Sequence, residues 1–212
     1  MTQTAAHKSK TVFLDAALQV IRAKGYEATS IDDICAQAGL KKGSFFHHFK
    51  SKEELAIAAA GHFAEMADNL FAVAPFRSLP DPLERLLGYV EFRRSILQGT
   101  LPEFTCLLGT MVQETFVSHP RIREACERNI RGHAMTLRED IAQAQRLYAP
   151  SADWSAESLA LHTQAVIQGA FILAKAGGGA AAAAESLTHL RRYIELLFAR
   201  PARAAAADKA RS

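Results

Sequence analysis

The stretch that decides the fold is Lys41-Lys42-Gly43-Ser44-Phe45-Phe46-His47-His48-Phe49-Lys50-Ser51-Lys52. It carries four lysines, three phenylalanines, two adjacent histidines and no acidic residue. A disordered basic tail has no reason to carry three large apolar side chains, because such side chains gain free energy only when they are buried. The pattern therefore predicts a helix that packs Phe45 and Phe49 against another helix and turns its cations to solvent.

Two helices are predicted before this stretch. From Thr11 to Lys24, apolar residues recur every three or four positions, which is typical of one buried helical face. Thr29 and Ser30 provide N-cap oxygens for a second, short helix that ends at Gly39. A tight turn then leads to a third helix at 42–48. This arrangement predicts a helix-turn-helix whose second member lies in the major groove of DNA.

A fourth helix is predicted to begin after Ser51. Ser51 and Glu54 form an S-x-x-E capping box, and Lys52 lies in the first helical turn. A helix N-terminus beside an ammonium group binds phosphate, because both present positive charge to it. Lys42 and Lys52 are therefore the predicted phosphate contacts.

These motifs resemble those of the TetR/AcrR regulators. The resemblance rests on K-G-Y-E-A-T-S-I-D-D-I at 24–34, A-G-L-K-K-G-S-F-F-H-H-F at 38–49 and K-S-K-E-E-L at 50–55, and it covers the rest of the chain only in outline. It implies a homodimeric, all-helical repressor whose second domain binds a small molecule and so changes the spacing of two DNA-reading heads. This chain has Phe46 where the family usually has a tyrosine that touches phosphate.

The resemblance also implies which residues contact DNA. Ser44 and His47 occupy positions where the family reads base edges, and a hydroxyl or an imidazole can donate or accept a hydrogen bond there. His48 is predicted to reach phosphate, and Phe46 to make van der Waals contact only. For Lys41 and Lys50 an ordinary solvated surface is the alternative. The predicted DNA-binding residues are Thr29, Ser30, Lys42, Gly43, Ser44, Phe46, His47, His48 and Lys52.

Length and composition fit a globular intracellular protein. The chain has 212 residues, of which 49% are hydrophobic, so it can bury a substantial core in one or two domains. The net charge is only +3, so the placement of charge, not its total, supports DNA binding. Three cysteines far apart argue against a disulfide framework or a zinc site and fit a reducing cytoplasm. No signal sequence or long apolar run predicts secretion or membrane insertion.

Beyond the fourth helix, prolines punctuate the chain, and no segment alternates as strands do. Helices are predicted at 82–98, 103–118, 121–148, 155–176 and 181–200. The predicted fold is therefore all-α, with about nine helices. A helix-turn-helix domain at 1–50 precedes a ligand-binding and dimerisation domain at 51–200, in which 51–75 is the connecting helix, and a flexible tail at 201–212.

The last two helices are predicted to form a dimer interface of two helices from each subunit. Residues 164–176 are apolar on nearly every side, and such a helix must be covered on all sides. The alternative is that helices of the same subunit complete the burial. The predicted interface residues are Ala165, Gly169, Ala170, Leu187, Leu190, Ile194 and Leu197.

The sequence is least informative about the ligand pocket. Cys106 begins a C-L-L-G stretch similar to one in a subgroup of these regulators, and thiols near helix N-termini can react with electrophiles. Its apolar neighbours favour the alternative of a packed, inert cysteine. Lys175 either stabilises a helix C-terminus or meets an acidic ligand. The predicted pocket residues, each with a core position as its alternative, are Phe104, Cys106, Met111, His133, Trp154, Phe171 and Lys175.

The motifs of common enzyme classes are missing from the sequence. It has no phosphate-binding glycine loop, no G-x-S-x-G and no H-E-x-x-H, so no enzyme activity, metal or cofactor is predicted. The expected function is a cytoplasmic repressor that binds a near-palindromic operator as a homodimer and is released by a small-molecule or electrophile inducer. The alternative is an architectural DNA-binding protein without ligand control, which would not require so long a second domain.

Overall fold

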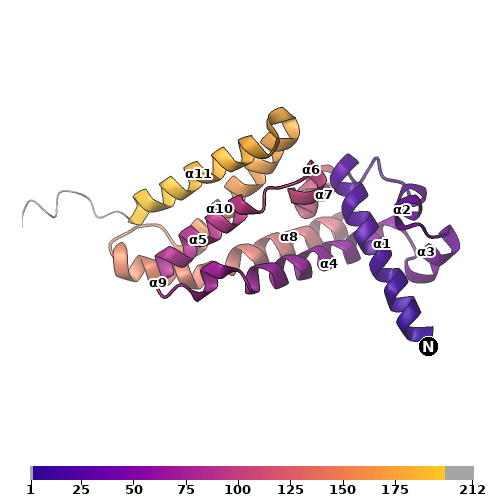
Figure 1. The fold of residues 1–212 in the computed structure, drawn as a ribbon, viewed down its shortest axis with the longest axis horizontal. Coiled ribbons are helices and arrows are strands. Elements are labelled where there is room, and N and C mark those ends of the chain that lie inside the picture. Colours follow the sequence, from indigo (N-terminus) through magenta and orange to yellow (C-terminus); the bar gives the residue numbers. More distant parts are fainter. Residues whose placement is uncertain (1, 199–212) are drawn as a thin grey trace, which may run out of the picture.

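The computed structural model describes residues 2–198, with side chains from residue 8 onward, and its regular structure in that range is helical, without a β-strand. The all-α prediction is confirmed. Figure 1 shows a small head of three helices at one end of an elongated helical body. The predicted tail at 201–212 lies outside the described residues.

The head consists of α1 (Thr2–Lys24), α2 (Ile31–Ala38) and α3 (Lys42–His48). Helix α1 begins well before Thr11, where the apolar pattern starts. The side chain of Ser30 accepts a hydrogen bond from the backbone of Asp33 while Asp33 bonds back to Ser30, and this reciprocal cap starts α2. Gly39 ends α2 with a left-handed φ of 64°, which glycine adopts without steric cost.

Three aromatic rings fix α3 against α1. Phe13 meets Phe45 and Phe49 edge-on, with ring centroids 5.6 and 6.4 Å apart. All three rings are buried. This edge-to-face geometry is the favourable one for aromatic pairs, and it adds to the free energy of burying the rings. The prediction that Phe45 and Phe49 are core anchors is confirmed.

Helix α4 (Lys52–Ala72) connects the head to the body, and Figure 1 shows it running from one into the other. The hydroxyl of Ser51 accepts a hydrogen bond of 3.1 Å from the backbone of Glu54, as the capping box predicts. The carboxylate of Glu54 reaches one residue further back than expected, to the backbone of Lys50 at 2.8 Å. The end of α3 and the start of α4 are thereby joined.

The body contains two more breaks than predicted. The helix expected at 103–118 divides at Thr105, whose hydroxyl donates to the backbone carbonyl of Leu101 at 2.7 Å. The helix expected at 121–148 divides at Thr136, whose hydroxyl donates to the backbone carbonyl of His133 at 2.8 Å. Threonine side chains compete in this way with the helical backbone. The body elements after α4 are the 3₁₀ turn η1 (Pro75–Ser78), α5 (Pro82–Ser95), α6 (Leu101–Phe104), α7 (Leu107–Thr115), α8 (Pro120–Met135), α9 (Arg138–Tyr148), α10 (Ala156–Leu173), the π-helical turn η2 (Ala174–Gly178) and α11 (Gly179–Phe198).

Helices α10 and α11 form an antiparallel pair along one side of the body (Figure 1). The chain reverses at Gly177 and Gly179, which have φ values of 128° and 56°. By length and composition the span Ala156–Phe198 is apolar enough to cross a membrane. It is, however, two helices folded back on each other rather than one long rod.

The described residues bury two apolar clusters. The first joins the head to α4, α7 and the start of α8, and Met111 lies inside it. The second fills the body between α5, α9, α10 and α11. The head is therefore packed against the body by the first cluster. The second cluster is separate from it and lies farther from the head.

The residues predicted for the dimer interface mostly face the interior of their own subunit. Ala170, Leu187, Leu190 and Ile194 are buried in the body cluster, and Leu197 is partly buried against it. Burial inside one subunit argues against placing Ala170, Leu187, Leu190 and Ile194 at a dimer interface, whereas Leu197 stays a prediction. Of the seven, only Ala165 is exposed, and Gly169 is half-buried. The large apolar residues that α10 and α11 do expose are Ile172, Leu173, Tyr193 and Leu196.

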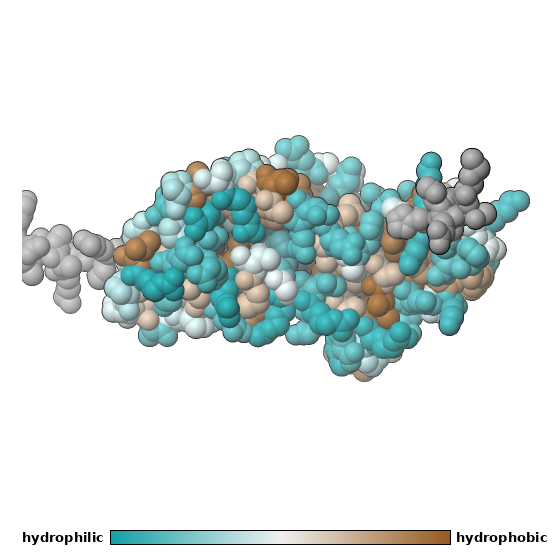
Figure 2. Space-filling view, turned by 90° about the horizontal axis from the view of Figure 1, so that it is seen from below, coloured by the Kyte–Doolittle hydropathy of each residue, from teal (hydrophilic) through white to brown (hydrophobic). Residues whose placement is uncertain are grey.

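The face of the molecule seen in Figure 2 is mainly hydrophilic. Its hydrophobic residues form small, separated patches rather than one continuous surface. Isolated exposed apolar residues are normal on soluble proteins. Nothing on this face calls for a covering partner.

Candidate nucleic-acid interface and internal cavity

The outer surface of α3 carries the predicted base-reading residues. Lys42, Gly43 and His47 are exposed, Ser44 is half-buried, and the Phe46 ring is 51% exposed. Phe45 lies beneath Phe46, with ring centroids 5.3 Å apart. The helix therefore presents one polar, basic face to solvent and anchors the opposite face in the head.

Lys42 has a partner within the head. Its ammonium nitrogen lies 2.9 Å from a carboxylate oxygen of Asp32, and both side chains are exposed. An exposed ion pair of this kind contributes little to folding, so the ammonium group can exchange its carboxylate for a phosphate at small cost.

Lys52 is more deeply engaged than its predicted role as a phosphate contact suggests. Its ammonium group donates to the backbone carbonyls of Tyr26 and Thr29, at 3.0 and 2.9 Å. It also lies 4.1 Å from the centroid of the Tyr26 ring, within range of a cation–π interaction. Because an ammonium group has three donors, one remains for a phosphate. Lys52 therefore fixes the turn between α1 and α2 from the start of α4.

Three other predicted contacts are bonded inside the head. Thr29 is buried, and its hydroxyl donates to the carbonyl of Gly25 at 2.5 Å. Ser30 is exposed but caps α2. A ring nitrogen of His48 lies 2.7 Å from the hydroxyl of Ser9, and burial lowers the pKa of His48, with electrostatic contributions from the neighbouring His47 and Lys10 adding to the effect. Thr29 and His48 thus support the head from within.

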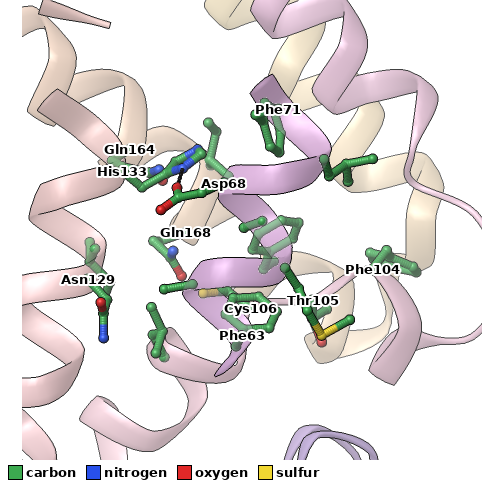
Figure 3. Close-up of a pocket in the computed structure, with 18 of the residues that line it drawn as sticks. Phe63, Asp68, Phe71, Phe104, Thr105, Cys106, Asn129, His133, Gln164 and Gln168 are labelled. Carbon is green, nitrogen blue, oxygen red and sulfur yellow. Dashed lines mark ion pairs between the residues drawn. The ribbon is translucent and has the colours of Figure 1, made fainter. Parts of the chain in front are cut away.

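A cavity of roughly 330 Å³ opens between the head and the body. Its walls come from α1, α4, α6, α8 and α10, with single contributions from α5 and α7. Figure 3 shows that the labelled side chains converge on this space from several helices. Four phenylalanines line the cavity beside several aliphatic side chains: Phe63, Phe71, Phe104 and Phe171.

The structure brings together some of the predicted pocket residues and separates others. Phe104, Cys106, His133 and Phe171 line the cavity. Lys175 lines only a small adjoining pocket beside Cys106, where its ammonium group donates to the hydroxyl of Thr110 at 2.5 Å. Met111 and Trp154 do not line the cavity. Met111 is buried in the head cluster, and Trp154 packs edge-on against Phe198, with centroids 5.3 Å apart.

Several cavity residues were not predicted. They include Arg22 on α1, Phe63 and Phe71 on α4, and Arg93 on α5, which are three separate parts of the sequence. Others are Asn129, one turn before the predicted His133 on α8, and Gln164 and Gln168, one turn apart on α10. Two glutamines one turn apart in an otherwise apolar helix are the sequence signal that could have identified this wall.

His133 is held in its neutral form. Arg93 donates to its Nε2 at 2.7 Å, and the Tyr89 hydroxyl lies 3.1 Å from the same nitrogen. Because Nε2 accepts, the hydrogen of the neutral ring is on Nδ1. Burial lowers the pKa of His133 to about 3, and the charges of Arg93 and Arg77 add to this shift.

Two buried polar atoms of the cavity wall have no hydrogen-bond partner among the described residues. They are Nδ1 of His133 and Oε1 of Gln164. Nδ1 lies 3.7 Å from a carboxylate oxygen of Asp68, an approach marked in Figure 3 and too long for a hydrogen bond. Unpaired buried polar atoms are rare, because each costs about 1–3 kcal/mol.

Arg22 links the head to the cavity wall. Its guanidinium group donates to the backbone carbonyls of Glu103 and Thr105, at 3.4 and 3.2 Å, where α6 ends. The side chain also lines the cavity. A shift of α6 would therefore act directly on α1 through these hydrogen bonds.

Cys106 is the accessible thiol of the three. It is half-buried at the N-cap of α7, where its sulfur accepts a hydrogen bond of 3.5 Å from the backbone of Gly109. Cys35 and Cys126 are buried, and burial raises the pKa of Cys126 to about 12. Among the side chains that the structure describes, those of residues 8–198, no group of three His, Cys, Asp or Glu is placed to hold a metal ion.

Comparison with known proteins accounts for both parts of this arrangement. Residues 13–59 match the family model for "Bacterial regulatory proteins, tetR family", and residues 82–190 match "Tetracyclin repressor-like, C-terminal domain". The first match covers the head with the start of α4, and the second covers most of the body.

Individual proteins and structures agree with these models. The chain is 33% identical over 146 residues to the HTH-type transcriptional regulator UidR of Escherichia coli, which is 68% of each chain. It is 27% identical over 143 residues to the HTH-type transcriptional regulator LmrA of Bacillus subtilis, 64% of this chain and 72% of LmrA. A crystal structure of a TetR transcriptional regulator from Chloroflexus aurantiacus superposes with a TM-score of 0.78 at 28% identity, over 91% of this chain and 96% of that one.

These relatives are transcriptional regulators, a class of proteins without catalytic activity. The helix-turn-helix predicted from the sequence lies inside the first matched domain, and the cavity lies where that domain meets the second. The chain belongs to the TetR/AcrR family of transcriptional regulators.

Proposed function

We propose that this protein is a repressor that binds a near-palindromic operator as a homodimer in the cytoplasm and is released when a small molecule occupies the internal cavity. The helix-turn-helix supplies the DNA contacts, and α3 is the helix that enters the major groove. The chain's relatives support DNA binding, and the proposal adds the dimer, the effector and the direction of control.

The observation that carries the proposal is that the cavity is built in part from the helices that hold the head. Leu18 and Arg22 of α1 line it, together with residues 63–71 of α4. An occupant would therefore contact the same helices that set the position of α3. A cavity that served only as a packing defect in the body would have no such connection.

The exposed apolar residues of α10 and α11 support a dimer. Leu173 and Leu196 are 55% and 74% exposed, and Ile172 and Tyr193 are also exposed. Two helices from each subunit would bury them in a four-helix arrangement. We therefore place the proposed dimer contact on this outer face, with Ala165, instead of on the buried leucines.

Release follows as a shift between two arrangements of the dimer. In one, the two α3 helices are about 34 Å apart and fit successive major grooves. A ligand that fits the cavity better when α1 and α4 have moved favours the other arrangement. DNA affinity then falls in proportion to the ligand's preference for that arrangement.

The test begins with selection of a binding site from a randomised duplex library. Fluorescence anisotropy then measures the affinity of the dimer for the selected site with and without a panel of small molecules. Release by at least one compound supports the proposal. Undiminished binding with every compound supports the alternative, an architectural DNA-binding protein, and failure to select any duplex refutes both.

An electrophile could act through Cys106 from the same cavity. The sulfur would add to the alkene carbon of a compound such as N-ethylmaleimide, while the thiol proton passes to the neighbouring carbon. We expect mass spectrometry of the native protein to find Cys106 modified well before Cys35 and Cys126, which are buried. Equal modification of all three thiols would remove the support for this route.

A further inference from the structure

The cavity wall formed by α8 and α10 carries four uncharged polar residues, together with one exposed arginine, Arg128. Asn129 and His133 lie one turn apart on α8, and Gln164 and Gln168 lie one turn apart on α10. Two of these four residues leave an atom unpaired, His133 a donor at Nδ1 and Gln164 an acceptor at Oε1. Gln164 is 5% exposed, so bulk water does not readily compensate for its missing bond.

Two of the three arginines that line the cavity, Arg22 and Arg93, are already engaged in hydrogen bonds. Arg93 donates to His133 and Tyr89 and stacks on Phe71, with its guanidinium carbon 4.3 Å from the ring centroid. Arg22 donates to backbone carbonyls of α1 and α6. Because Arg22 and Arg93 are engaged, an anionic ligand would depend on the exposed Arg128 and would meet Asp68 beside His133. A cationic ligand would meet Arg22 and Arg93.

Aromatic rings form another part of the lining. Phe63 and Phe71 of α4, Phe104 of α6 and Phe171 of α10 surround the space. Figure 3 draws Gln164, His133 and Asp68 at one end of it and Phe63, Thr105 and Cys106 at the other. A flat apolar body would pack against the rings while a polar group at its edge faced α8 and α10.

We propose that the effector of this regulator is an uncharged, ring-bearing alcohol or phenol whose hydroxyl accepts a hydrogen bond from Nδ1 of His133 and donates one to Oε1 of Gln164. A hydroxyl is the smallest uncharged group that does both. This inference rests on the proposed function for its meaning in regulation, but the binding chemistry it names is independent of DNA. The neutral state of His133 agrees with an uncharged partner.

The test compares four probes that share one ring system: 2-naphthol, 2-methylnaphthalene, 2-naphthoate and trimethyl(2-naphthyl)ammonium. Equilibrium dialysis measures their binding to the full-length protein at pH 7.5. We expect 2-naphthol to bind roughly tenfold more tightly than 2-methylnaphthalene, the effect of about one net hydrogen bond. The anion and the cation should bind more weakly than 2-naphthol.

The variant Gln164→Leu assigns the preference to its residue. It keeps the approximate size of the side chain and removes the unpaired oxygen, so we expect it to fold, to bind 2-methylnaphthalene at least as well as the natural protein, and to lose the preference for 2-naphthol. Gln143→Leu is the matched control, since Gln143 lies on α9 outside the cavity wall. This control should keep the preference in full.

Three results would overturn the inference: tighter binding of the anion or the cation than of 2-naphthol, no binding of any probe, or an unchanged preference in Gln164→Leu. Duplex binding by the same samples separates this inference from the proposed function. Protein that binds DNA but none of the probes refutes only the effector class. Protein that binds 2-naphthol but no duplex refutes only the proposed regulation.

Discussion

The head and the cavity wall differ in whether their polar groups have hydrogen-bond partners. In the head, Lys52 donates to the carbonyls of Tyr26 and Thr29, and the hydroxyl of Thr29 donates to that of Gly25. In the cavity wall, Nδ1 of His133 and Oε1 of Gln164 have no hydrogen-bond partner among the described residues. The head is thus a completed structure before it meets DNA, whereas the cavity wall leaves hydrogen bonds that an occupant can complete.

This difference suggests how the two regions divide the work. A rigid head keeps the α3 surface in one shape, so that its position rather than its internal structure is what regulation changes. A ligand that forms hydrogen bonds with these unpaired groups lowers the free energy of the complex. Arg22 belongs to both regions, because it lies on α1 and donates to the end of α6.

The largest expected effect breaks the head. Phe45→Ala should lower the free energy of unfolding by about 3–5 kcal/mol, since the ring is fully buried against Phe13. Urea denaturation measures this loss. Phe46→Ala is the matched control on the neighbouring, half-exposed ring and should cost less than about 1 kcal/mol. Similar losses for the two variants would contradict the assignment of inner and outer faces to α3.

The next effect tests the neutral state of His133. The pKa of His133 is lowered from 6.5 to about 3, so between these values the unfolded chain binds a proton that the folded chain does not. Above pH 6.5, His133 is neutral in both the folded and the unfolded chain and does not lower the free energy of unfolding. As the pH falls from 6.5 toward 3, the free energy of unfolding decreases by no more than about 1.4 kcal/mol per pH unit. Unfolding measured from pH 7 to pH 4 should show this slope reduced in His133→Asn. If NMR showed the His133 ring of the folded protein taking up its proton near pH 6.5, the lowered pKa would be refuted.

Two lysine variants compare structural and surface cations. Lys52→Ala should lower the free energy of unfolding by about 1–3 kcal/mol, because two carbonyls lose their donor. It should also weaken DNA binding on every sequence. Lys41→Ala removes the same charge from an exposed side chain, and its stability should change by less than about 0.5 kcal/mol. If Lys41 contacts phosphate, Lys41→Ala should reduce the slope of log binding constant against log salt concentration by about one. Equal stability of the two variants would show that the Lys52 contacts contribute nothing.

The smallest expected effect is a gain. Gln164→Leu should raise the free energy of unfolding by about 1 kcal/mol, because it removes a buried oxygen without a partner. Thermal unfolding of this variant and of Gln143→Leu provides the comparison. A loss of stability in Gln164→Leu alone would mean that the amide is satisfied in the ligand-free protein, and the contrast between head and cavity would then weaken.

Much of the head could be predicted because its signals are local. The limits of α3 and the cap of α2 depend on residues within a few positions of each other, such as Ser30 and Asp33. Phe45 and Phe49 were identified as anchors because large apolar side chains in a basic stretch have no other explanation. The breaks at Thr105 and Thr136 were missed, since a threonine bends or ends a helix only when its surroundings leave the hydroxyl turned to the backbone.

The sequence by itself determined an all-helical chain with a basic helix-turn-helix, because periodicity, caps and glycine stops act over one or two helical turns. Only the tertiary structure decided that Leu187, Leu190 and Ile194 face their own subunit, since a periodic pattern marks a buried face without saying which surface covers it. The same holds for the cavity. Arg22, His133 and Gln164 meet there because three helices distant in sequence pack together, and no local signal encodes that meeting.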